Sequence, residues 1–171
     1  MSERTEKRAP ILVRPARTDD IAHLAAWAIA MALETEHKRL DQKTVEGGVR
    51  AVFDDPGRGR YFIAERTTGD DAVAIGTLML THEWSDWRCG DWWWIQSVYV
   101  APDFRRRGAY RALYEHVRAL AEVTPRVCGL RLYVERGNVK AQRTYRNMGM
   151  HDAGYRMYET EFAGDAAKSD N

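Results

Sequence analysis

VYVAPDFRRRGAYRAL, running from Val98 to Leu113, is the stretch that decides the fold, because it joins a strand to a helix through a basic turn with one glycine. The residues before Pro102 are largely β-branched or aromatic, as a buried strand prefers. The residues after Gly108 are apolar at helical spacing, at Tyr110, Leu113, Tyr114, Val117, Leu120 and Ala121. Backbone N–H groups at a helix start have no intrahelical partner, and the helix dipole favours an anion there. The turn is therefore suited to hold a diphosphate.

A second segment lies downstream, with GLRLYVERGN over Gly129–Asn138, followed by Ala141, Tyr145, Gly149 and Met150. It resembles the second acetyl-CoA motif of the GNAT acetyltransferases, which is a strand, then N-x-x-A-x-x-x-Y, then a short Gly-hydrophobic turn. The first stretch is similar to that family's R/Q-x-x-G-x-G/A signature through Arg105-x-x-Gly108. It departs from the signature at Tyr110, where the family has a second small residue.

This resemblance implies an α/β chain with the GNAT fold. That fold has a central mixed, mostly antiparallel sheet of about six to seven strands flanked by about four helices, with strands splayed at the acetyl-CoA site. We expect one GNAT acetyltransferase domain over residues 11–161, between disordered tails at 1–10 and 162–171. A single core is reasonable at 171 residues, because a chain of this size buries roughly 70% of its unfolded surface.

Local patterns place the individual elements. Strands are predicted over Ile11–Arg14, Tyr61–Glu65, Val73–Leu80, Trp92–Val100, Leu130–Val134 and Tyr155–Glu161. Helices are predicted after the capping residues Thr18–Asp20, over Thr44–Phe53, between Gly108 and Thr124, and over Lys140–Asn147. Thr68–Asp71 reads as the turn of a hairpin.

Composition excludes several classes of protein. Twenty-six basic side chains balance twenty-five acidic ones, which gives no support to a general polyanion-binding role. Cys89 and Cys128 fit neither a disulfide scaffold nor a metal-binding spacing, so no metal is expected. No stretch approaches the ~20 apolar residues of a membrane span. A reduced cytoplasmic protein, bound neither to a membrane nor to nucleic acid, is the simplest interpretation.

The resemblance also implies a binding mode for acetyl-CoA, used as co-substrate. The backbone of Val98 and Val100 would meet the pantetheine amides, with the Val98 N–H near the thioester carbonyl as an oxyanion donor. The turn would bind the pyrophosphate, and one guanidinium would reach the 3′-phosphate. The implied acetyl-CoA residues are Val98, Tyr99, Val100, Arg105, Arg106, Arg107, Gly108, Ala109, Tyr110, Arg111, Asn138 and Tyr145. An equally simple interpretation leaves the valines in the core and the arginines solvated.

The implied reaction is direct attack of a primary amine on the acetyl carbonyl in a ternary complex, with CoA thiolate leaving. Tyr145 is the candidate general acid for the sulfur, because the four-residue step from Ala141 puts both on one helix face. A tyrosine on an amphipathic helix is also a common core residue.

The general base is open. The histone-modifying branch of the family has a glutamate where this chain has Trp94, so Glu83 at the end of the preceding strand is our candidate, acting directly or through water. Asp91 and ordered water are alternatives, and a solvated Glu83 is the plain structural interpretation. His82 should project to the opposite face of its strand.

Five of the six tryptophans lie between Trp84 and Trp94, interleaved with acidic residues. Such a wall suits a cationic acceptor, and we assign Trp84 and Trp87 as candidate contacts to a polyamine, an amino sugar or a lysine-like amine. Strand alternation puts Trp93 on the face opposite Trp92 and Trp94, so one set is free to pack under a helix or to form a homodimer interface.

Two other classes of function remain. The chain could bind acetyl-CoA as a sensor without catalysis, since Tyr110 and the absent family glutamate depart from the family pattern. It could also be a nucleic-acid-binding module that uses the Arg105–Arg107 cluster and nearby aromatic rings. Hydrolase and zinc-protease motifs such as G-x-S-x-G and H-E-x-x-H do not occur in the sequence. The predicted acceptor is a primary amine on a small molecule or a peptide.

Overall fold

The computed structural model describes residues 10–68, 71–160 and 162. The chain divides into two compact units, one up to Leu132 and one from Tyr133 onward. Apart from Pro10 and Phe162, the tails predicted to be disordered lie outside the described residues, as does the predicted hairpin tip at Gly69 and Asp70.

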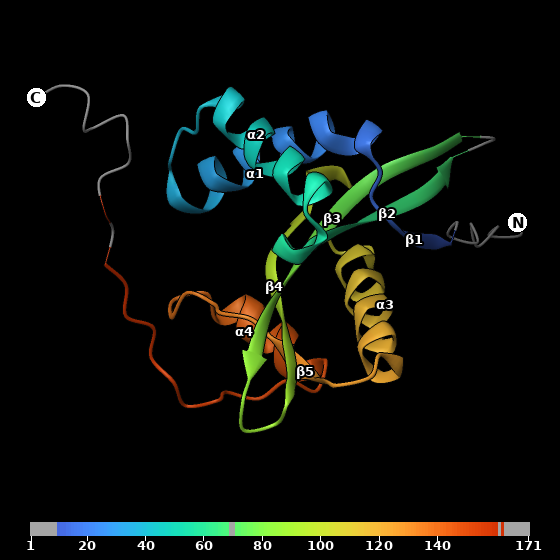
Figure 1. Cartoon of the computed structure of the whole chain (residues 1–171). Coiled ribbons are helices and arrows are strands. Elements are labelled where there is room, and N and C mark those ends of the chain that lie inside the picture. Colours follow the sequence, from blue (N-terminus) through green and yellow to red (C-terminus); the bar gives the residue numbers. More distant parts are fainter. Residues whose placement is uncertain (1–9, 69–70, 161, 163–171) are drawn as a thin grey trace, which may run out of the picture. The chain divides into compact units, whose positions relative to one another are not determined.

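One sheet dominates the first unit (Figure 1). In the described residues it has five strands: β1 (Ile11–Pro15), β2 (Arg60–Thr68), β3 (Asp71–Ser85), β4 (Gly90–Val100) and β5 (Val127–Arg131). The strands follow chain order across the sheet, and neighbours pair antiparallel except for the parallel pair of β4 and β5. The mixed, mostly antiparallel sheet is therefore confirmed, with fewer strands than expected.

The helices begin and end close to the predicted positions. In the described residues there are four: α1 (Ile21–Glu36), α2 (Gln42–Asp54), α3 (Ala109–Val123) and α4 (Val139–Asn147). Within the described ranges, three short 3-10 turns precede α1, β2 and α3, at Thr18–Asp20, Pro56–Arg58 and Pro102–Phe104. Asp41 caps the start of α2, where its carboxylate accepts a hydrogen bond from the Thr44 N–H at 2.8 Å.

Two strand predictions need correction. The segment Tyr155–Glu161 was predicted as a last strand, yet residues 151–160 have no regular structure and are exposed, and Glu161 lies outside the described residues. An alternating pattern makes a strand only where a partner supplies ladder hydrogen bonds, and the sheet of the described residues ends at β5. The predicted strand Leu130–Val134 is instead Val127–Arg131, because pairing with β4 ends at Arg131.

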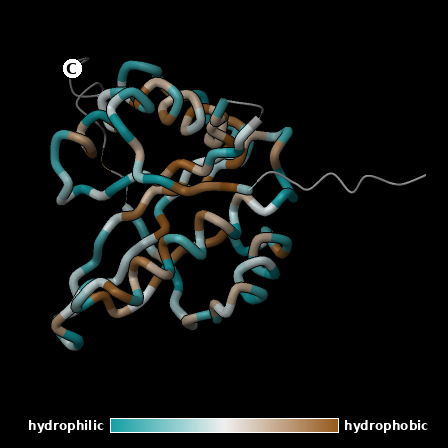
Figure 2. Tube along the Cα trace, turned by 90° about the vertical axis from the view of Figure 1, so that its right-hand side faces the viewer, coloured by the Kyte–Doolittle hydropathy of each residue, from teal (hydrophilic) through white to brown (hydrophobic). Residues whose placement is uncertain are grey.

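The two faces of the sheet carry different helices (Figure 1). Ile63 points into a core cluster with Leu24, Trp27 and other residues of α1 and α2. Phe62, its neighbour, points to the other face and meets the His116 ring of α3 at 5.2 Å. In Figure 2 the hydrophobic segments run along the strands between these layers. No helix within the described ranges is both long and apolar enough to cross a bilayer.

Helix α4 belongs to the second unit and has sequence-encoded ends. The Asn138 side chain accepts a hydrogen bond from the Ala141 N–H at 3.0 Å and caps its start. Gly149 follows its end with φ +87°, and Met150 N–H donates to Tyr145 O at 3.1 Å. This bond, together with the one from Gly149 N–H to Arg146 O at 3.0 Å, forms a glycine C-cap, for which the positive φ favours glycine.

Candidate active site

Strand β4 has an open edge at its C-terminal half. Its parallel pairing with β5 ends at Trp94 and Arg131, whereas its pairing with β3 continues to Val100. A β-bulge lies at the same place, because Met79 pairs with Ser97 and Leu80 with Ile95, which leaves Gln96 as the extra residue. A bulge bends the strand that carries it. In the part of the chain that the structure describes, β4 therefore has no strand partner on the β5 side after Trp94.

The hydrogen-bond pattern shows which backbone groups face this open edge. The Ala101 N–H donates to Ile75 O of β3 at 2.9 Å. Because a trans peptide holds N–H and C=O on opposite sides, the Val100 carbonyl points away from β3. The two-residue alternation of a strand directs the peptide groups of Val98 to the same edge, while those of Tyr99 face β3. The two valines named from the sequence thus direct their backbone groups to the open edge of β4.

The basic turn follows at the end of β4. Arg106 has φ +60° and Gly108 has φ +95°, so two of its residues adopt left-handed backbone conformations. The Ala112 N–H donates to Gly108 O at 2.9 Å as the first bond of α3, and the amides before it project from the helix end. A turn of this kind concentrates N–H groups in a concavity that suits an anion. Tyr110 is half-buried in the first turn of α3, with its ring 6.3 Å from that of Tyr114.

The basic side chains of this region go to different places. Arg105 reaches back over β4, and its Nε donates to Val100 O at 2.8 Å while its Nη2 donates to Glu34 Oε2 at 2.6 Å. Arg111 lies 3.7 Å from Glu115 along α3. Arg106 and Arg107 are exposed at the turn itself. The latter two are consequently the side chains of this group best placed to meet a bound phosphate.

Glu34 joins the end of α1 to this region. Its Oε1 accepts a hydrogen bond from the Tyr99 hydroxyl at 3.0 Å, and the Arg105 guanidinium lies 5.4 Å from the Tyr99 ring centroid. The hydrogen bond from Arg105 lowers the pKa of the Glu34 carboxyl. Burial, followed by the contact with Glu34, raises the pKa of the Tyr99 phenol. Nothing in the sequence pattern near Glu34 indicates this link, because its partners are distant in the chain.

The Glu83 carboxylate, our candidate base, has two partners. Its Oε1 accepts from Arg131 Nη1 at 2.6 Å, and its Oε2 accepts a short hydrogen bond from the Trp94 indole. The Arg131 guanidinium in turn stacks 4.1 Å from the Trp92 ring centroid. These groups lie on the α1 face of the sheet, at the point where β4 and β5 separate. A water molecule or amine that Glu83 deprotonates has to share the carboxylate with both partners.

The tryptophans separate by strand alternation. Trp93 is 2% exposed and packs on the α3 face, with Arg60 stacked at 4.2 Å and His82 at 6.0 Å from its ring. His82 thus projects away from Glu83, as expected. Trp84 and Trp87, 56% and 88% exposed, lie at the far end of the β3–β4 hairpin. Trp84 pairs with Asp91, and the path from Asp91 to Val98 spans roughly 23 Å at ~3.3 Å per residue.

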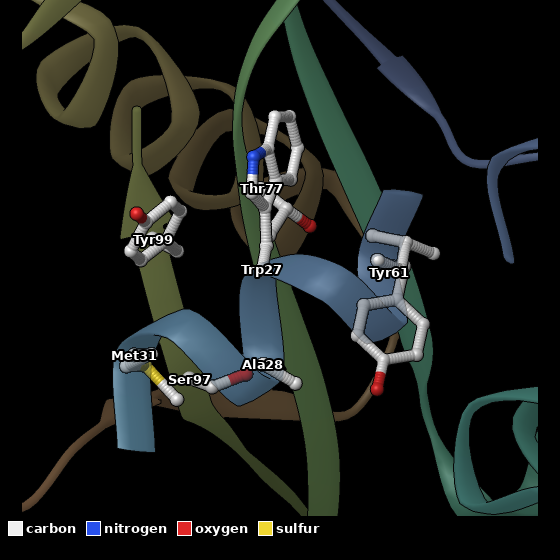
Figure 3. Close-up of a pocket in the computed structure, with 8 residues that line it drawn as sticks. Trp27, Ala28, Met31, Tyr61, Thr77, Ser97 and Tyr99 are labelled. Atoms are coloured by element: carbon white, nitrogen blue, oxygen red, sulfur yellow. The ribbon is translucent and has the colours of Figure 1, made fainter. Parts of the chain in front are cut away.

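A small pocket lies on the α1 face beside the open half of β4 (Figure 3). Its volume is about 20 Å³, enough for one water molecule, and α1, β2, β3 and β4 all contribute to it. The lining residues are Leu24, Trp27, Ala28, Met31, Tyr61, Thr77, Ser97 and Tyr99. Burial raises the pKa of the Tyr61 phenol. Of these lining residues, Tyr99 was a site candidate from the sequence and the others were not, since the packing of α1 on the sheet is a tertiary contact.

Tyr145, the candidate acid, belongs to the second unit. It is half-buried on α4 together with Ala141, while Arg143 and Arg146 are exposed, so the four-residue step does place the pair on one face. Burial raises the pKa of the Tyr145 phenol above its ordinary value. The roles of Tyr145 and Asn138 at acetyl-CoA stay predictions.

The comparisons with known proteins agree with this arrangement. The model of the Acetyltransferase (GNAT) family matches residues 21–150. A possible acetyltransferase from Clostridium difficile 630 is 38% identical in sequence with a TM-score of 0.81, over 90% of this chain and 99% of that chain. The chain therefore belongs to the GNAT acetyltransferase family. A comparison with curated proteins gave no match.

More distant solved structures share the fold alone. An aminoglycoside N-acetyltransferase AAC(6′)-Iy in complex with CoA is 14% identical with a TM-score of 0.72, over 92% of this chain and 99% of that one. A ribosomal-protein-alanine N-acetyltransferase from Brucella melitensis biovar Abortus 2308 is 16% identical with a TM-score of 0.67, over 90% and 100%.

Proposed function

We propose that this protein is an N-acetyltransferase that moves the acetyl group of acetyl-CoA to a primary amine in a ternary complex. The observation that carries the proposal is the open edge of β4, which leads directly into the turn at the start of α3. An extended amide-bearing arm pairs with an open strand edge, and a diphosphate suits the N–H groups of such a turn. One ligand with both parts, in that order, is CoA.

In this proposal the backbone holds the donor. The Val98 peptide groups and the Val100 N–H meet the pantetheine amides, since Arg105 already donates to the Val100 carbonyl, and the Val98 N–H donates to the thioester oxygen as negative charge develops on it. The amides of Arg106 to Arg111 bind the pyrophosphate, with the Arg106 and Arg107 guanidinium groups near the phosphates.

The reaction then needs three proton transfers. The amine nitrogen attacks the acetyl carbon, the carbon–sulfur bond breaks, and the thiolate takes the phenolic proton of Tyr145. Glu83 accepts the proton of the ammonium through a chain of water molecules, since it pairs with Trp92, six residues from Val98, and Arg131 and Trp94 already contact its oxygens directly. The second proton leaves the nitrogen after the attack and returns Tyr145 to its neutral form through water. The Tyr145 phenol, whose pKa is raised by burial, is protonated at neutral pH, as an acid requires.

The position of the tryptophans constrains the acceptor. A small amine at Val98 cannot also touch Trp84 or Trp87, roughly 20 Å away along the hairpin. Contact with Trp84 and Trp87 therefore requires an extended acceptor, such as a long polyamine or a lysine-bearing peptide. A small acceptor would instead lie near the aromatic rings of Trp27, Tyr61 and Tyr99.

A second candidate is an acetyl-CoA sensor without catalysis. Two observations favour it: Tyr110 replaces a small residue of the family signature, and the Glu83 carboxylate is paired with Arg131. A sensor would bind CoA, but no amine would cause the release of CoA thiol from acetyl-CoA.

The test is release of CoA thiol from acetyl-CoA across polyamines, amino sugars, amino acids and lysine-bearing peptides, with CoA binding measured in parallel. Amine-dependent release supports the transferase and identifies the acceptor class. Binding without release points to the sensor, and absence of CoA binding contradicts both. Trp84→Ala and Trp87→Ala should raise the KM of an extended acceptor and leave that of a small one unchanged.

A further inference from the structure

The carboxylate of Glu34 connects three parts of the first unit. Glu34 lies in the last turn of α1, and its two oxygens accept hydrogen bonds from the Tyr99 hydroxyl of β4 at 3.0 Å and from Arg105 at 2.6 Å. Arg105 is 71 positions further along the chain and directly precedes the turn at the start of α3. Glu34 thus links the end of a helix to the entry of the proposed phosphate-binding turn.

Arg105 is held at several points. Its Nε donates to the Val100 carbonyl at 2.8 Å, its Nη2 donates to Glu34, and its guanidinium lies over the Tyr99 ring. Its own N–H donates to Pro102 O at 3.2 Å and closes the 3-10 turn before it. With both the side chain and the backbone engaged, the orientation of the peptide that leads into Arg106 is determined.

The backbone of the next residue, Arg106, shows why the anchoring of Arg105 matters for the turn. Arg106 has φ +60°, a conformation that costs a non-glycine residue on the order of 1 kcal/mol and persists only when its surroundings hold it. The side chain of Arg106 is exposed and gives no packing support. The anchored Arg105 on one side and the α3 helix on the other are therefore what holds the turn in shape.

We propose that Glu34 is a positioning residue for acetyl-CoA, which clamps Arg105 across the end of β4 and so preorganises the Arg106–Gly108 turn for the pyrophosphate. This inference rests on the proposed function. It gives the arginine of the Arg-x-x-Gly motif a supporting role through Val100 and Glu34, while the backbone of the turn makes the phosphate contacts. Glu34 acts entirely through Arg105 and touches neither substrate.

The contact of Glu34 with Arg105, which we call the clamp, should affect CoA affinity more than the stability of the fold. Glu34 and Arg105 side chains are about 40% exposed, so their ion pair alone contributes little to stability. Preorganisation affects binding more than folding, because a loosened turn must be ordered again by the ligand. Removing the carboxylate should then weaken CoA binding roughly 3- to 10-fold and leave the melting temperature nearly unchanged.

The experiment compares Glu34→Gln, Arg105→Gln and the double variant in the full chain, with CoA affinity from calorimetry and steady-state kinetics alongside. We expect each single variant to raise the Kd for CoA and the KM for acetyl-CoA, with kcat at saturation and the amine KM unchanged. The double variant should bind no more weakly than Arg105→Gln, because Glu34 acts through that residue. A general loss of folding would lower kcat and melting temperature together.

The matched control is Glu36→Gln, two residues away on α1, where the carboxylate pairs with Lys38 at 2.8 Å on the exposed surface. It should bind CoA like the wild type. Tyr99→Phe removes one of the two Glu34 bonds and keeps every charge, so it should give a smaller weakening in the same direction. Wild-type affinity in Glu34→Gln, or additive losses in the double variant, would overturn the clamp. A wild-type chain that binds no CoA would overturn the proposed function, and the clamp with it, in the first titration.

Discussion

The Tyr145 phenol is half-buried on α4, and burial raises its pKa above the ordinary value of 10.0. The neutral phenol is the form that can donate a proton, so this shift extends the pH range over which an acid at this position stays loaded. The same shift has a consequence for folding, because the phenolate is disfavoured in the native state. Stability linked to this group is complete below pH ~10 and falls as the pH rises through the folded pKa.

Tyr145→Phe tests the acid directly. We expect kcat to fall about 10²- to 10⁴-fold, the usual contribution of a general acid, with the Kd for CoA unchanged because the ring remains. In the wild type the alkaline limb of the kcat profile should lie above pH ~10. Stopped assays of thiol release over pH 6 to about 11 provide both numbers. Wild-type turnover in the variant would remove Tyr145 from the mechanism and leave it as a packing residue.

At the scale of elements, the start of α1 is tied to the sheet by charge. Arg14 of β1 lies 2.7 Å from Asp20, just before α1, and 2.7 Å from Glu65 of β2. The hydrogen bond from Arg14 lowers the pKa of the Asp20 carboxyl, and the Arg17 N–H also donates to this carboxylate at 2.7 Å. These bonds hold the start of α1 against β1 and β2, and so help to orient α1 on the face of the sheet where the pocket lies.

Asp20→Asn should therefore destabilise the protein by about 1–2 kcal/mol at pH 7, since it replaces charge-assisted bonds in a partly buried position. The folded pKa of Asp20 is depressed, so the stabilisation is present above pH ~4 and is lost as the pH falls through the folded value. Urea unfolding at pH 7 and near pH 3 would measure both states. Asp19→Asn, at the exposed neighbouring position, is the control and should be near neutral. An Asp20→Asn deficit of equal size at both pH values would contradict the ion-pair explanation.

At the scale of the whole molecule, ligand binding should be visible as stability. A ligand that binds only the folded state at 100 times its Kd contributes about 2.7 kcal/mol. For a chain of this length each kcal/mol raises the melting temperature by roughly 2–4 °C, so saturating CoA should raise it by about 5–10 °C. Differential scanning calorimetry with and without CoA measures this shift. Dephospho-CoA, which lacks only the 3′-phosphate, is the matched ligand for the arginines of the turn, and a smaller shift would assign them that contact.

The same calorimetric measurement tests whether CoA contacts both units of the chain. If CoA contacts both, as the proposed roles of Val98 and Tyr145 require, the ligand should move every unfolding transition upward. An unfolding transition whose temperature CoA does not change would belong to a unit that does not bind CoA. If that unit is the one with α4, the result would contradict the roles of Asn138 and Tyr145.

Much of the candidate site can be predicted from the chain because its determinants are local. The step from β4 through Pro102 to Gly108 and α3 depends on strand composition, a glycine at φ +95° and helical periodicity, all within one short stretch. Asn138 and Gly149 encode the ends of α4 in the same way. By contrast, Tyr155–Glu161 was predicted as a strand and forms none in its described part, because a strand requires a partner that local sequence does not supply.

The sequence by itself determined the family, the order of the elements as far as α4 and the basic turn, because those depend on neighbours within a few residues of one another. Only the tertiary structure decided which partners the long side chains found. Arg105 turns to Glu34 of α1, Glu83 turns to Arg131 of β5, and both partners are more than 45 residues away. The end of the β4–β5 ladder at Trp94 was decided in the same way, since it depends on where two strands part in space. The periodicity of the sequence indicates in which direction a side chain points from its own helix or strand. The packing of one element on another decides which residues that side chain contacts.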